Sequence, residues 1–403
     1  MKFGGTSVAN IKIMKNAVSK ISAEIDNDNK VIVVVSAMGS TTDNLVKKIK
    51  EVSTIYDATE YDAILSTGEN ISSSLMTLLL QKEGINARSW QGWQVPINTT
   101  DNHSNARILS INTKNLEEKF SAGMQVAIIA GFQGISNNNR VTTLGRGGSD
   151  TSAVALAAAI KAERCDIYTD VNGIYTTDPR ITSNAKKLDK ISYEEMLELA
   201  SLGAKVLQTR SVELAMQYKV KLRVLNSFNE GSGTILCDEE DIMEKRVVSG
   251  ITFSKNEAKL TLLSVKDKPG VAGIVFHCLS KANINVDMII QNISDNNLTD
   301  VTFSCPTDQV DMAKSSLEND RNKNILEYKE LDVDTQVSKI SIVGIGMRSH
   351  SGIAQTMFKT LGDENINIKV ISTSEIKISV LIERKYLELA VQALHEAFEL
   401  SKV

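Results

Sequence analysis

The C-terminal half of the chain carries an internal repeat, which restricts the fold more than any other feature of the sequence. The segment GVAGIVFHCLSKANINVDMI, residues 270–289, aligns without gaps on GIAQTMFKTLGDENINIKVI, residues 352–371. Eight of the twenty aligned positions are identical: Gly270/Gly352, Ala272/Ala354, Phe276/Phe358, Leu279/Leu361, Asn283/Asn365, Ile284/Ile366, Asn285/Asn367 and Ile289/Ile371. A match of this extent at one fixed offset indicates a duplicated small module.

Each copy has the same predicted order of elements: strand, helix, strand, strand, helix. In the first copy we expect strands at 260–265, 284–293, 300–305 and 324–331 and helices at 271–282 and 308–317. In the second we expect strands at 339–345, 366–371 and 376–382 and helices at 353–361 and 387–400. This order predicts two βαββαβ (ferredoxin-like) modules, of which the second is one strand short.

A segment upstream of the repeat is a candidate for the absent strand. The run VVSGITF, residues 247–253, precedes the first copy and has no assigned partner. A sheet short of an edge strand exposes unpaired backbone groups. We therefore predict that the first module, 254–335, is inserted into the second, 247–253 plus 336–403. This interpretation requires 247–253 to pair with the 339–345 region.

The N-terminal half alternates short apolar runs with helical stretches. The runs KVIVVVS (30–36), QVAIIAGF (125–132) and CDIYTDV (165–171) are typical of strands buried on both faces of a parallel sheet. Helical patterns at 70–84 and 149–165 lie between them. The alternation predicts a layered α/β/α domain with a mostly parallel central sheet over residues 1–230, followed by a polar, acidic linker at 231–246.

The overall composition argues against several classes of protein. A net charge of -4 argues against nucleic-acid binding, which usually requires a basic surface. The four cysteines contain no CxxC pair, so a reducing cytoplasm fits better than a disulfide framework or a zinc site. No run approaches the length of a membrane-spanning helix, and we expect none.

The chain begins MKFGGTS, with a lysine directly before two glycines. Glycines let a backbone approach a phosphate closely and direct N–H groups at it. Lys2 supplies a positive charge suited to a transferring phosphoryl group. The Walker A pattern GxxxxGK[ST] is absent, and this short stretch is also typical of an ordinary tight turn after a strand.

The segment TTLGRGGSDTSAVALAAA, residues 142–159, is more specific, because a glycine-rich loop leads directly into a helix. The free N–H groups and the dipole of a helix N-terminus form an anion site. Arg146 adds a guanidinium group suited to a carboxylate or phosphate, and Asp150 caps the helix or holds Mg²⁺. In the alternative interpretation, Ser149 or Asp150 is only an N-cap.

Three further stretches place polar groups after strands or before a helix. YTDVNGIYTTDPR (168–180) offers Thr169 and Asp170 at a strand end, the ring of Tyr175 for a base and Arg180 for a phosphate. A hairpin turn followed by a proline-stopped loop explains this stretch equally well. VSAMGSTTDNL offers Ser36 and Thr42, and LSTGENIS offers Glu69 just before a helix, where it could simply be a first-turn acid.

The stretches KFGGTS, SAMGSTTDNL, STGE, GRGGSDTSA and YTDVNGIYTTDPR occur in this order along the chain. Together they resemble the aspartate kinases of the amino-acid kinase superfamily, and the C-terminal repeat resembles that family's paired ACT domains. The resemblance covers essentially the whole chain. It implies the reaction ATP + L-aspartate → ADP + 4-phospho-L-aspartate, the first step of lysine, methionine and threonine biosynthesis.

The resemblance also implies a role for each matched residue. As catalytic residues it implies Lys2, which neutralises phosphoryl charge, Asp150, which organises the centre and its metal, and Arg146. Aspartate is held by Ser36, Thr42, Glu69, Arg146 and Ser149, with Arg146 on the α-carboxylate. ATP is held by Lys2, Gly4, Gly5, Thr169, Asp170, Tyr175, Arg180 and Lys205. Mg²⁺ arrives with ATP, near Asp150, and no other protein ligand for a metal is predicted.

The chain departs from the family pattern in two places. Family members usually carry a short strand before the KFGG lysine, whereas here the chain starts almost on Lys2. Either the sequence is truncated or renumbered, or the sheet lacks a strand. If the strand is lost, we expect Lys2 to be poorly anchored. In addition, Gln208 and Thr209 stand where a His-Pro pair is common. We expect this pair to lie behind the site and to have little effect.

The ACT resemblance implies feedback control by an amino acid, lysine and/or threonine. Such effectors bind where the strand–helix turn of one module meets the second strand of another. The matching residues are Asp267, Gly270, Ala272, Gln291 and Asn292, with Asn367 and Ile368 as the opposing wall. Asp267 suits the effector's α-amino group. Because the second copy lacks the DKPG turn, we predict that the first copy's site dominates, although DKPG is also an ordinary strand-to-helix turn.

Paired ACT modules normally assemble between chains, which implies a homo-oligomer. A regulatory-only product starting near Met243 would keep both modules, although Met243 is equally well a linker residue. Two other functions stay open: a superfamily member acting on glutamate, acetylglutamate or a nucleotide, and a catalytically inactive amino-acid sensor. The presence of Lys2, Arg146 and Asp150 argues against the sensor. Which amino acid inhibits, and the size of the oligomer, stay open at this point.

Overall fold

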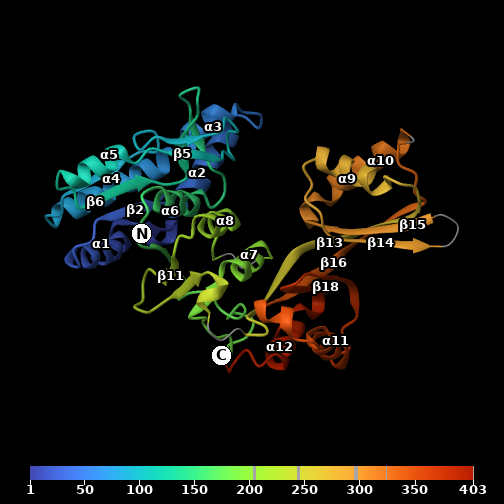
Figure 1. Ribbon diagram of the computed structural model, residues 1–403. Helices are drawn as coiled ribbons and strands as arrows, with labels where there is room; N and C mark the ends of the chain where they lie inside the picture. Colours follow the sequence, from blue (N-terminus) through green and yellow to red (C-terminus); the bar gives the residue numbers. More distant parts are fainter. Residues whose placement is uncertain (203–205, 243–245, 295–297, 324, 403) are drawn as a thin grey trace. The chain divides into compact units, whose positions relative to one another are not determined.

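The structure is a computed structural model that describes residues 1–202, 206–242, 246–294, 298–323 and 325–402 (Figure 1). The described chain divides into two compact units. The first comprises residues 1–174, 187–201 and 206–242, and the second comprises 175–186, 202 and 246–402. None of the helices in these ranges is both long enough and apolar enough to cross a membrane.

The first unit is built on a central sheet of eight described strands in the order β10-β12-β11-β9-β1-β2-β6-β3. Neighbouring strands are parallel except for the β11–β12 pair, so the predicted mostly parallel sheet is confirmed. The strands are β1 (Lys2–Phe3), β2 (Val31–Val35), β3 (Ala87–Trp90), β6 (Val126–Ala130), β9 (Cys165–Thr169), β10 (Lys190–Ser192), β11 (Leu222–Asn226) and β12 (Thr234–Cys237).

Helices and a small second sheet surround this central sheet (Figure 1). The apolar sides of α1 and α4 pack on the sheet in one continuous core, while α6 contacts β1, β2 and β9 and is almost entirely buried. The helices are α1 (Ile11–Asp26), α2 (Thr41–Val52), α3 (Ala58–Leu65), α4 (Thr67–Lys82), α5 (Lys114–Ser121), α6 (Gly148–Ala159), α7 (Tyr193–Ser201) and α8 (Thr209–Tyr218). The small sheet has the order β5 (Ile108–Ile111), β4 (Ile97–Thr99), β7 (Gln133–Ile135) and β8 (Val141–Thr143).

Strand β1 is held firmly, and the predicted poor anchoring of Lys2 is wrong. The two-residue strand is hydrogen-bonded in parallel with β2 on one side and β9 on the other. The N-terminal ammonium of Met1 donates to the carbonyl of Ile32 at 2.7 Å. Phe3 is fully buried and stacks on Tyr168 with 4.7 Å between ring centroids. Pairing on both sides therefore anchors Lys2 although the strand is short.

Strand β12 lies inside the range 231–246 that the sequence analysis assigned to a linker. It pairs in parallel with β10 and antiparallel with β11, so the central sheet extends beyond the predicted boundary at residue 230. Thr234, Leu236 and Cys237 are buried, and only Ile235 of this strand is exposed. Four residues set among glycines and acids form too short an apolar run to be recognised as a strand in the sequence.

The second unit is built on one antiparallel sheet of six described strands in the order β14-β15-β13-β16-β18-β17. The strands are β13 (Gly250–Lys266), β14 (Asp287–Ser294), β15 (Leu298–Cys305), β16 (Glu330–Val343), β17 (Ile368–Thr373) and β18 (Lys377–Glu383). The helices are α9 (Val271–Lys281) and α10 (Val310–Asn322) in the first module and α11 (Ile353–Asp363) and α12 (Leu387–Ala397) in the second.

The predicted pairing between the segment before the repeat and the second copy is confirmed. Residues Gly250 to Phe253 lie opposite Val343 to Ile340 in an antiparallel register. Strands that the sequence presented as separate are continuous in the structure, because β13 and β16 each run through both modules. The polar stretch 254–257 interrupts the apolar pattern, but the backbone continues through it with shifts of register rather than with a turn.

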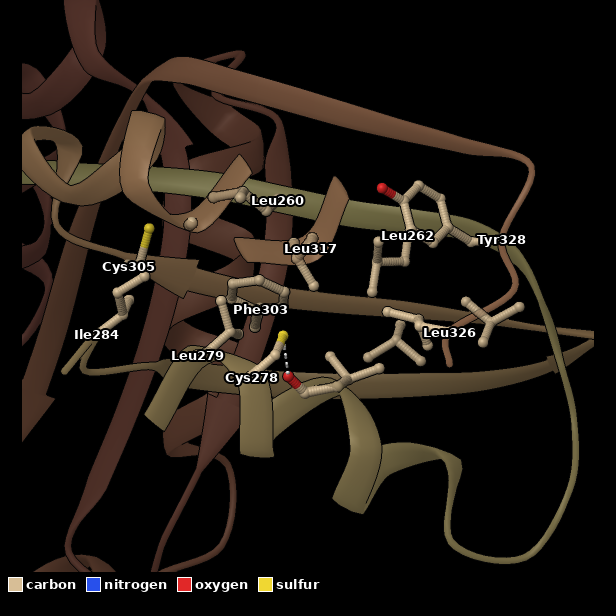
Figure 2. Packing of buried hydrophobic residues seen from close by; sticks show 14 of the residues in the cluster. Leu260, Leu262, Cys278, Leu279, Ile284, Phe303, Cys305, Leu317, Leu326 and Tyr328 are labelled. Atoms are coloured by element: carbon tan, nitrogen blue, oxygen red, sulfur yellow. Dashed lines mark hydrogen bonds between the residues drawn. The ribbon is translucent and has the colours of Figure 1, made fainter. Parts of the chain in front are cut away.

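Each module has its own apolar core. In the first, side chains of the sheet meet those of α9 and α10, and Figure 2 shows Leu260 and Phe303 of the strands with Leu279 and Leu317 of the helices in this cluster. In the second, α11 and α12 cover the other half of the long strands in the same way. Separate cores on shared strands are what a duplicated module with an exchanged strand requires.

Two of the identical pairs in the repeat have a backbone explanation. Gly270 and Gly352 precede α9 and α11 with φ of 93° and 92°, a region that side chains disfavour. Asn283 and Asn365 follow the same helices with φ of 54° and 56°, and asparagine tolerates this left-handed conformation better than most residues. These identical residues therefore mark the start and the end of the equivalent helices α9 and α11.

Candidate active site

The candidate site lies at the edge of the central sheet where β1, β2 and β9 end. Because these strands are parallel, the loops that follow them meet. The N–H of Gly39 donates to the carbonyl of Gly5 at 3.1 Å, and that of Gly4 to Tyr168 at 3.4 Å. A side chain at Gly5 would come within 3.0 Å of the carbonyl of Ala37. Gly5 thus permits the close approach of these loops.

Lys2 and Asp150 form an ion pair at the centre of this edge. Lys2 Nζ lies 2.5 Å from Asp150 Oδ1, and the two side chains are 12% and 10% exposed. Asp150 lies in the first turn of α6, which Gly147 opens in the left-handed conformation with φ of 72°. Within the described residues, Oδ1 of Asp150 has no hydrogen-bond partner beyond this charge contact. The pair puts a lysine charge beside a helix N-terminus, an arrangement suited to a phosphate.

Ser149 lies at the same place, packed against the end of β6. A side chain at Gly131 would come within 2.8 Å of Ser149 Oγ, and the N–H of Gly131 donates to the carbonyl of Val35 at 3.0 Å. The hydroxyl of Ser152, on the same helix, accepts from the N–H of Phe132 at 3.1 Å. Gly131 was not among the predicted site residues, and the pair Gly131-Phe132 directly after a buried run was the available signal.

Glu69 is buried next to the end of β2 and is more than a first-turn acid. Its Oε1 accepts the N–H of Ala37 at 3.0 Å, whereas its Oε2 has no hydrogen-bond partner among the described residues. Burial raises the pKa of Glu69 to about 7, although the hydrogen bond from Ala37 opposes the shift. Gly68 permits this closeness, since a side chain there would approach Ala37 Cβ to 2.8 Å. A half-satisfied buried carboxylate is suited to an ammonium group.

Arg146 is exposed in the loop between β8 and α6. The loop is held from outside by Arg210, which donates to the carbonyls of Leu144 at 2.7 Å and Ala106 at 2.9 Å. Gln208 lies against the loop itself, because its Cγ is 1.7 Å from where a Cβ on Gly147 would stand. The expectation that Gln208 lies behind the site is therefore corrected. Neither Gln208 nor Arg210 was predicted to touch this loop.

Ser36 and Thr42 are half-buried near the same edge, Ser36 directly after β2 and Thr42 in the first turn of α2. The N–H of Ser36 donates to the carbonyl of Phe3 at 3.1 Å, which ties it to the Lys2 strand. Thr169 ends β9, and its hydroxyl donates to Asp170 Oδ1 at 3.2 Å. These predicted residues follow neighbouring strands, as the sequence analysis expected.

The structure does not bring all predicted nucleotide residues into the first unit. Tyr175 and Arg180 belong to the second unit, in the segment Tyr175–Lys186. Arg180 is 89% exposed and is paired with Asp178 at 2.7 Å. Lys205 lies outside the described residues, as does Met243.

The predicted effector residues of the first module surround a pocket of about 390 Å³ in the second unit. It is lined by Asp267, Lys268, Pro269, Gly270, Val271, Ala272 and Gln291. Among the described residues, Asn292, Asn367 and Ile368 do not line it. The DKPG turn thus forms a concave surface together with β14, while the expected opposing wall is not part of this pocket.

A second cavity, of about 400 Å³, lies at the opposite edge of the central sheet. Its walls include Met1, Val31 and Cys165, at the amino ends of β1, β2 and β9. The groups described above follow the carboxyl ends of the same strands. This cavity is therefore separate from the candidate active site.

Comparisons with known proteins agree with this geometry. The model of the amino acid kinase family matches residues 1–226, and the ACT domain model matches 263–320 and 340–398. The chain is 50% identical over 400 residues to an aspartate kinase of Pseudomonas putida, covering 99% of this chain and 97% of the relative. It is 49% identical over 405 residues to an aspartokinase of Pseudomonas aeruginosa, with 99% and 97% covered.

The chain belongs to the aspartate kinases of the amino acid kinase family. Two solved structures of Escherichia coli aspartokinase III are similar to this aspartate kinase, each at 26% identity and with 98% of both chains covered. The complex with aspartate and ADP (R-state) matches with a TM-score of 0.80. The complex with lysine and aspartate (T-state) matches with a TM-score of 0.75.

Sequence reasoning missed Asp62 of this aspartate kinase, a fully buried carboxylate on α3. It accepts hydrogen bonds from the N–H of Thr143 at 2.9 Å, from the Thr143 hydroxyl at 2.6 Å and from the N–H of Ser104 at 3.0 Å. His103 Nδ1 lies 2.8 Å away. One carboxylate thus fixes α3 to the strand that leads into the Arg146 loop. No local sequence pattern around Asp62 indicates that it fixes α3 to this strand, because its hydrogen-bond partners are far along the chain.

Proposed function

We propose that this aspartate kinase transfers the γ-phosphoryl group of ATP to the β-carboxylate of L-aspartate at the group formed by Lys2, Asp150 and the start of α6. The products are ADP and 4-phospho-L-aspartate: a bond forms between phosphorus and a carboxylate oxygen, and the bond to the departing ADP oxygen breaks. The observation that carries the proposal is the buried 2.5 Å pair of Lys2 and Asp150 at a glycine-rich strand edge.

The chemistry requires no general base. The β-carboxylate of aspartate is already ionised at neutral pH and attacks phosphorus directly. Catalysis then consists of in-line positioning and neutralisation of the charge on the phosphoryl oxygens. Lys2 and the N–H groups at the start of α6 supply that positive charge, and Gly4 and Gly5 let the backbone approach the phosphates.

Aspartate is bound by groups around the ends of β2 and α6. Arg146 binds the α-carboxylate with its guanidinium group, a pairing that planar donors favour. The unpaired oxygen of Glu69 accepts the α-ammonium group, which would satisfy its buried carboxylate. The hydroxyls of Ser36, Thr42 and Ser149 provide further hydrogen bonds.

A magnesium ion carried by ATP fits the residues present. Mg²⁺ in kinases is commonly held by one or two carboxylates together with phosphate oxygens. Asp150, with a buried carboxylate oxygen that makes no hydrogen bond to the described residues, would hold it. When bound, the ion neutralises phosphate charge. Among the described residues, no group of three or more acids, histidines or cysteines could form a metal site by itself.

The nucleotide is proposed to be bound by Thr169, Asp170, Tyr175, Arg180 and Lys205. Lysine and/or threonine is proposed to bind the Asp267 pocket and inhibit the enzyme. The enzyme is proposed to be a homo-oligomer assembled through the ACT modules. A regulatory-only subunit that starts near Met243 is a further proposal. The solved complex of Escherichia coli aspartokinase III with lysine and aspartate supports lysine as an effector by analogy. A cytoplasmic location is supported by four buried, unpaired cysteines.

The test is turnover of the purified full chain with Mg-ATP and one acceptor at a time: aspartate, glutamate, N-acetylglutamate or a nucleoside monophosphate. ADP release is measured together with trapping of the acyl phosphate by hydroxylamine. We expect equal amounts of ADP and aspartyl hydroxamate, and no turnover by an Asp150→Asn variant. Turnover with glutamate or a nucleotide instead identifies another member of the superfamily. No turnover with any acceptor, together with lysine or threonine binding, identifies a sensor.

A further inference from the structure

The segment Tyr175–Lys186 leaves the first unit and packs within the second. Both of its ends stay tied to the first unit, where the N–H of Leu188 donates to the carbonyl of Ile174 at 2.8 Å. Two further hydrogen bonds close the segment into a loop. The N–H of Thr176 donates to the carbonyl of Lys186 at 2.8 Å, and that of Lys186 donates to Thr176 Oγ1 at 3.0 Å.

The second module forms hydrogen bonds to this loop at Thr176. The N–H of Ile251, at the start of β13, donates to the carbonyl of Thr176 at 2.7 Å. Thr176 Oγ1 lies 3.0 Å from Nε2 of His395 on α12. Thr176 is fully buried and His395 is 2% exposed. The carbonyl and the hydroxyl of Thr176 are therefore held by elements of the second module, away from water.

A second attachment lies farther along the loop. The side chain of Gln392, also on α12, donates from Nε2 to the carbonyl of Ile181 at 2.8 Å. The side chain of Ile181 packs against the apolar core of the second module. Tyr175 and Arg180 lie next to the two attached residues, Thr176 and Ile181. The orientation of α12 therefore determines the backbone position of Tyr175 and Arg180.

We propose that His395 is a positioning residue for the nucleotide: through Thr176 it fixes the loop 175–186, which carries Tyr175 and Arg180, to the second ACT module. This inference rests on the proposed function, from which it takes the nucleotide role of Tyr175 and Arg180. Aspartate is bound by residues of the first unit alone. The second module therefore acts on ATP binding and leaves aspartate binding unchanged.

The chemistry of the contact suits a permanent, neutral link. Burial lowers the pKa of His395, so the imidazole is neutral at physiological pH. Thr176 Oγ1 already accepts the N–H of Lys186, which leaves the hydroxyl proton to be donated to Nε2. Loss of either partner leaves a buried polar group unsatisfied and loosens the loop.

The test uses the full-length enzyme and four variants: His395→Leu, Thr176→Val, the double variant and His395→Gln. We expect each of the first three to raise the KM for ATP by roughly three- to tenfold, the loss expected for one buried hydrogen bond. The KM for aspartate and kcat should change by less than about twofold. The double variant should be no worse than the worse single variant, because both remove the same contact. His395→Gln keeps a hydrogen-bonding group and should restore the parent KM.

His277 on α9 offers a matched control, because it is an exposed histidine on a helix of the first module. His277→Leu should leave the KM for ATP unchanged. An unchanged KM for ATP in both His395→Leu and Thr176→Val overturns the inference, as do fully additive effects in the double variant or an equal rise in the KM for aspartate. If His395→Leu does not fold, Thr176→Val and His395→Gln decide the matter.

The inference and the proposed function fail differently. An active parent enzyme whose variants bind ATP normally contradicts the positioning role of His395 and leaves the proposed function intact. A parent chain without aspartate turnover contradicts the proposed function. In that case ATP binding by the parent and Thr176→Val, measured by calorimetry, still tests the loop: equal affinities overturn the inference, and weaker binding by the variant supports it.

Discussion

The parallel sheet of the first unit and the antiparallel sheet of the second place their buried charges differently. In the first, Lys2 and Asp150 lie at the end of the sheet, in loops and at a helix start. In the second, Lys339 of β16 lies between the strands of two modules, 3.0 Å from Glu257 Oε1 on β13 and 2.8 Å from Asp287 Oδ2 on β14.

The partners of these lysines differ as well. Among the described residues, Lys2 has one carboxylate partner, Asp150, at 2.5 Å. Lys339 has two, and is 7% exposed. Burial alone would lower the pKa of Lys339, but the charges of Glu257 and Asp287 outweigh it and raise the pKa. The protein itself saturates the charge of Lys339, whereas we propose that the charge of Lys2 meets a substrate.

The two modules of the second unit also differ at their equivalent turns. In the first, β13 runs on to Lys266 and the DKPG turn borders a pocket. In the second, β16 stops at Val343, and the backbone of 246–248 lies against Gly344 and Gly346. A side chain at either glycine would come within 2.3 Å of a carbonyl oxygen of that backbone. The exchanged strand therefore enters next to the second turn, and among the described residues no such segment lies against Gly270 at the first.

These differences predict that substitutions in the two units have different effects. Substitutions among the charges of the first unit should change turnover and leave the modules intact. Substitutions of the saturated charge in the second unit should change stability, and those in its open turn should change regulation.

Removal of the charge at Lys339 should have the largest effect. Lys339→Met leaves Glu257 buried without a partner, and breaking a buried pair costs about 3–5 kcal/mol. The unfolding transition of the second unit, followed by chemical denaturation, should shift accordingly. Replacing Glu257 by Gln in the same chain should recover part of the loss. Lys385→Met, which removes an exposed pair with Glu383, is the control and should change nothing measurable. A stable Lys339→Met variant contradicts the structural role.

Removal of the charge at Lys2 should affect chemistry alone. Lys2→Met should lower kcat by about 10²–10³-fold, the loss typical of one group that stabilises transition-state charge. Binding of lysine or threonine to the second unit, measured by calorimetry, should stay the same. Lys12→Met, on the exposed side of α1, serves as the matched control. Retention of more than a tenth of the parent kcat would remove Lys2 from the catalytic residues.

Removal of Asp267 should affect regulation alone. Asp267→Ala should raise the effector concentration for half-inhibition by about 10–100-fold, the value of a hydrogen bond to a charged group. The kinetic constants without effector should stay those of the parent. His350→Ala, in the equivalent turn of the second module, should leave inhibition nearly unchanged. Equal losses of inhibition in the two variants would make the two turns equivalent and contradict the comparison.

The pH dependence of aspartate binding should show the smallest effect. The pKa of Glu69 is about 7 because the side chain is buried. If the ionised form binds the substrate's ammonium group, as proposed, the KM for aspartate should fall roughly five- to tenfold between about pH 6 and about pH 8 as the carboxyl loses its proton. Glu69→Gln should show a higher KM and a flat profile. A parent KM that rises over this range would have the wrong sign for an ionised Glu69.

The sequence predicted much of the fold because its signals are local. Short β-branched runs flanked by helices indicated the parallel sheet, and the repeat indicated two modules and the exchanged strand that pairs at Gly250–Phe253. It did not predict β12, whose four residues lie in a polar stretch, or the continuity of β13 through residues 254–257. Both depend on pairing with strands far along the chain.

The candidate site was predictable where glycines and charged groups stand together, as in KFGG and GRGGSD. Asp62, Arg210 and Gln208 were not, because each acts on the Arg146 loop from a distant element. The anchoring of Lys2 was predicted wrongly, since the sequence shows the length of a strand but not the neighbours that pair with it.

The sequence by itself determined the two sheets, the duplicated module and the residue types suited to phosphoryl transfer. These follow from periodicity, from repeated positions such as Gly270/Gly352 and Asn283/Asn365, and from motifs that span a few residues. Only the tertiary structure decided that Glu69 is buried with one oxygen unpaired among the described residues, that Lys339 is saturated, and that the loop with Tyr175 and Arg180 is attached to α12. The physical reason is that burial and partnership are properties of groups brought together from distant parts of the chain.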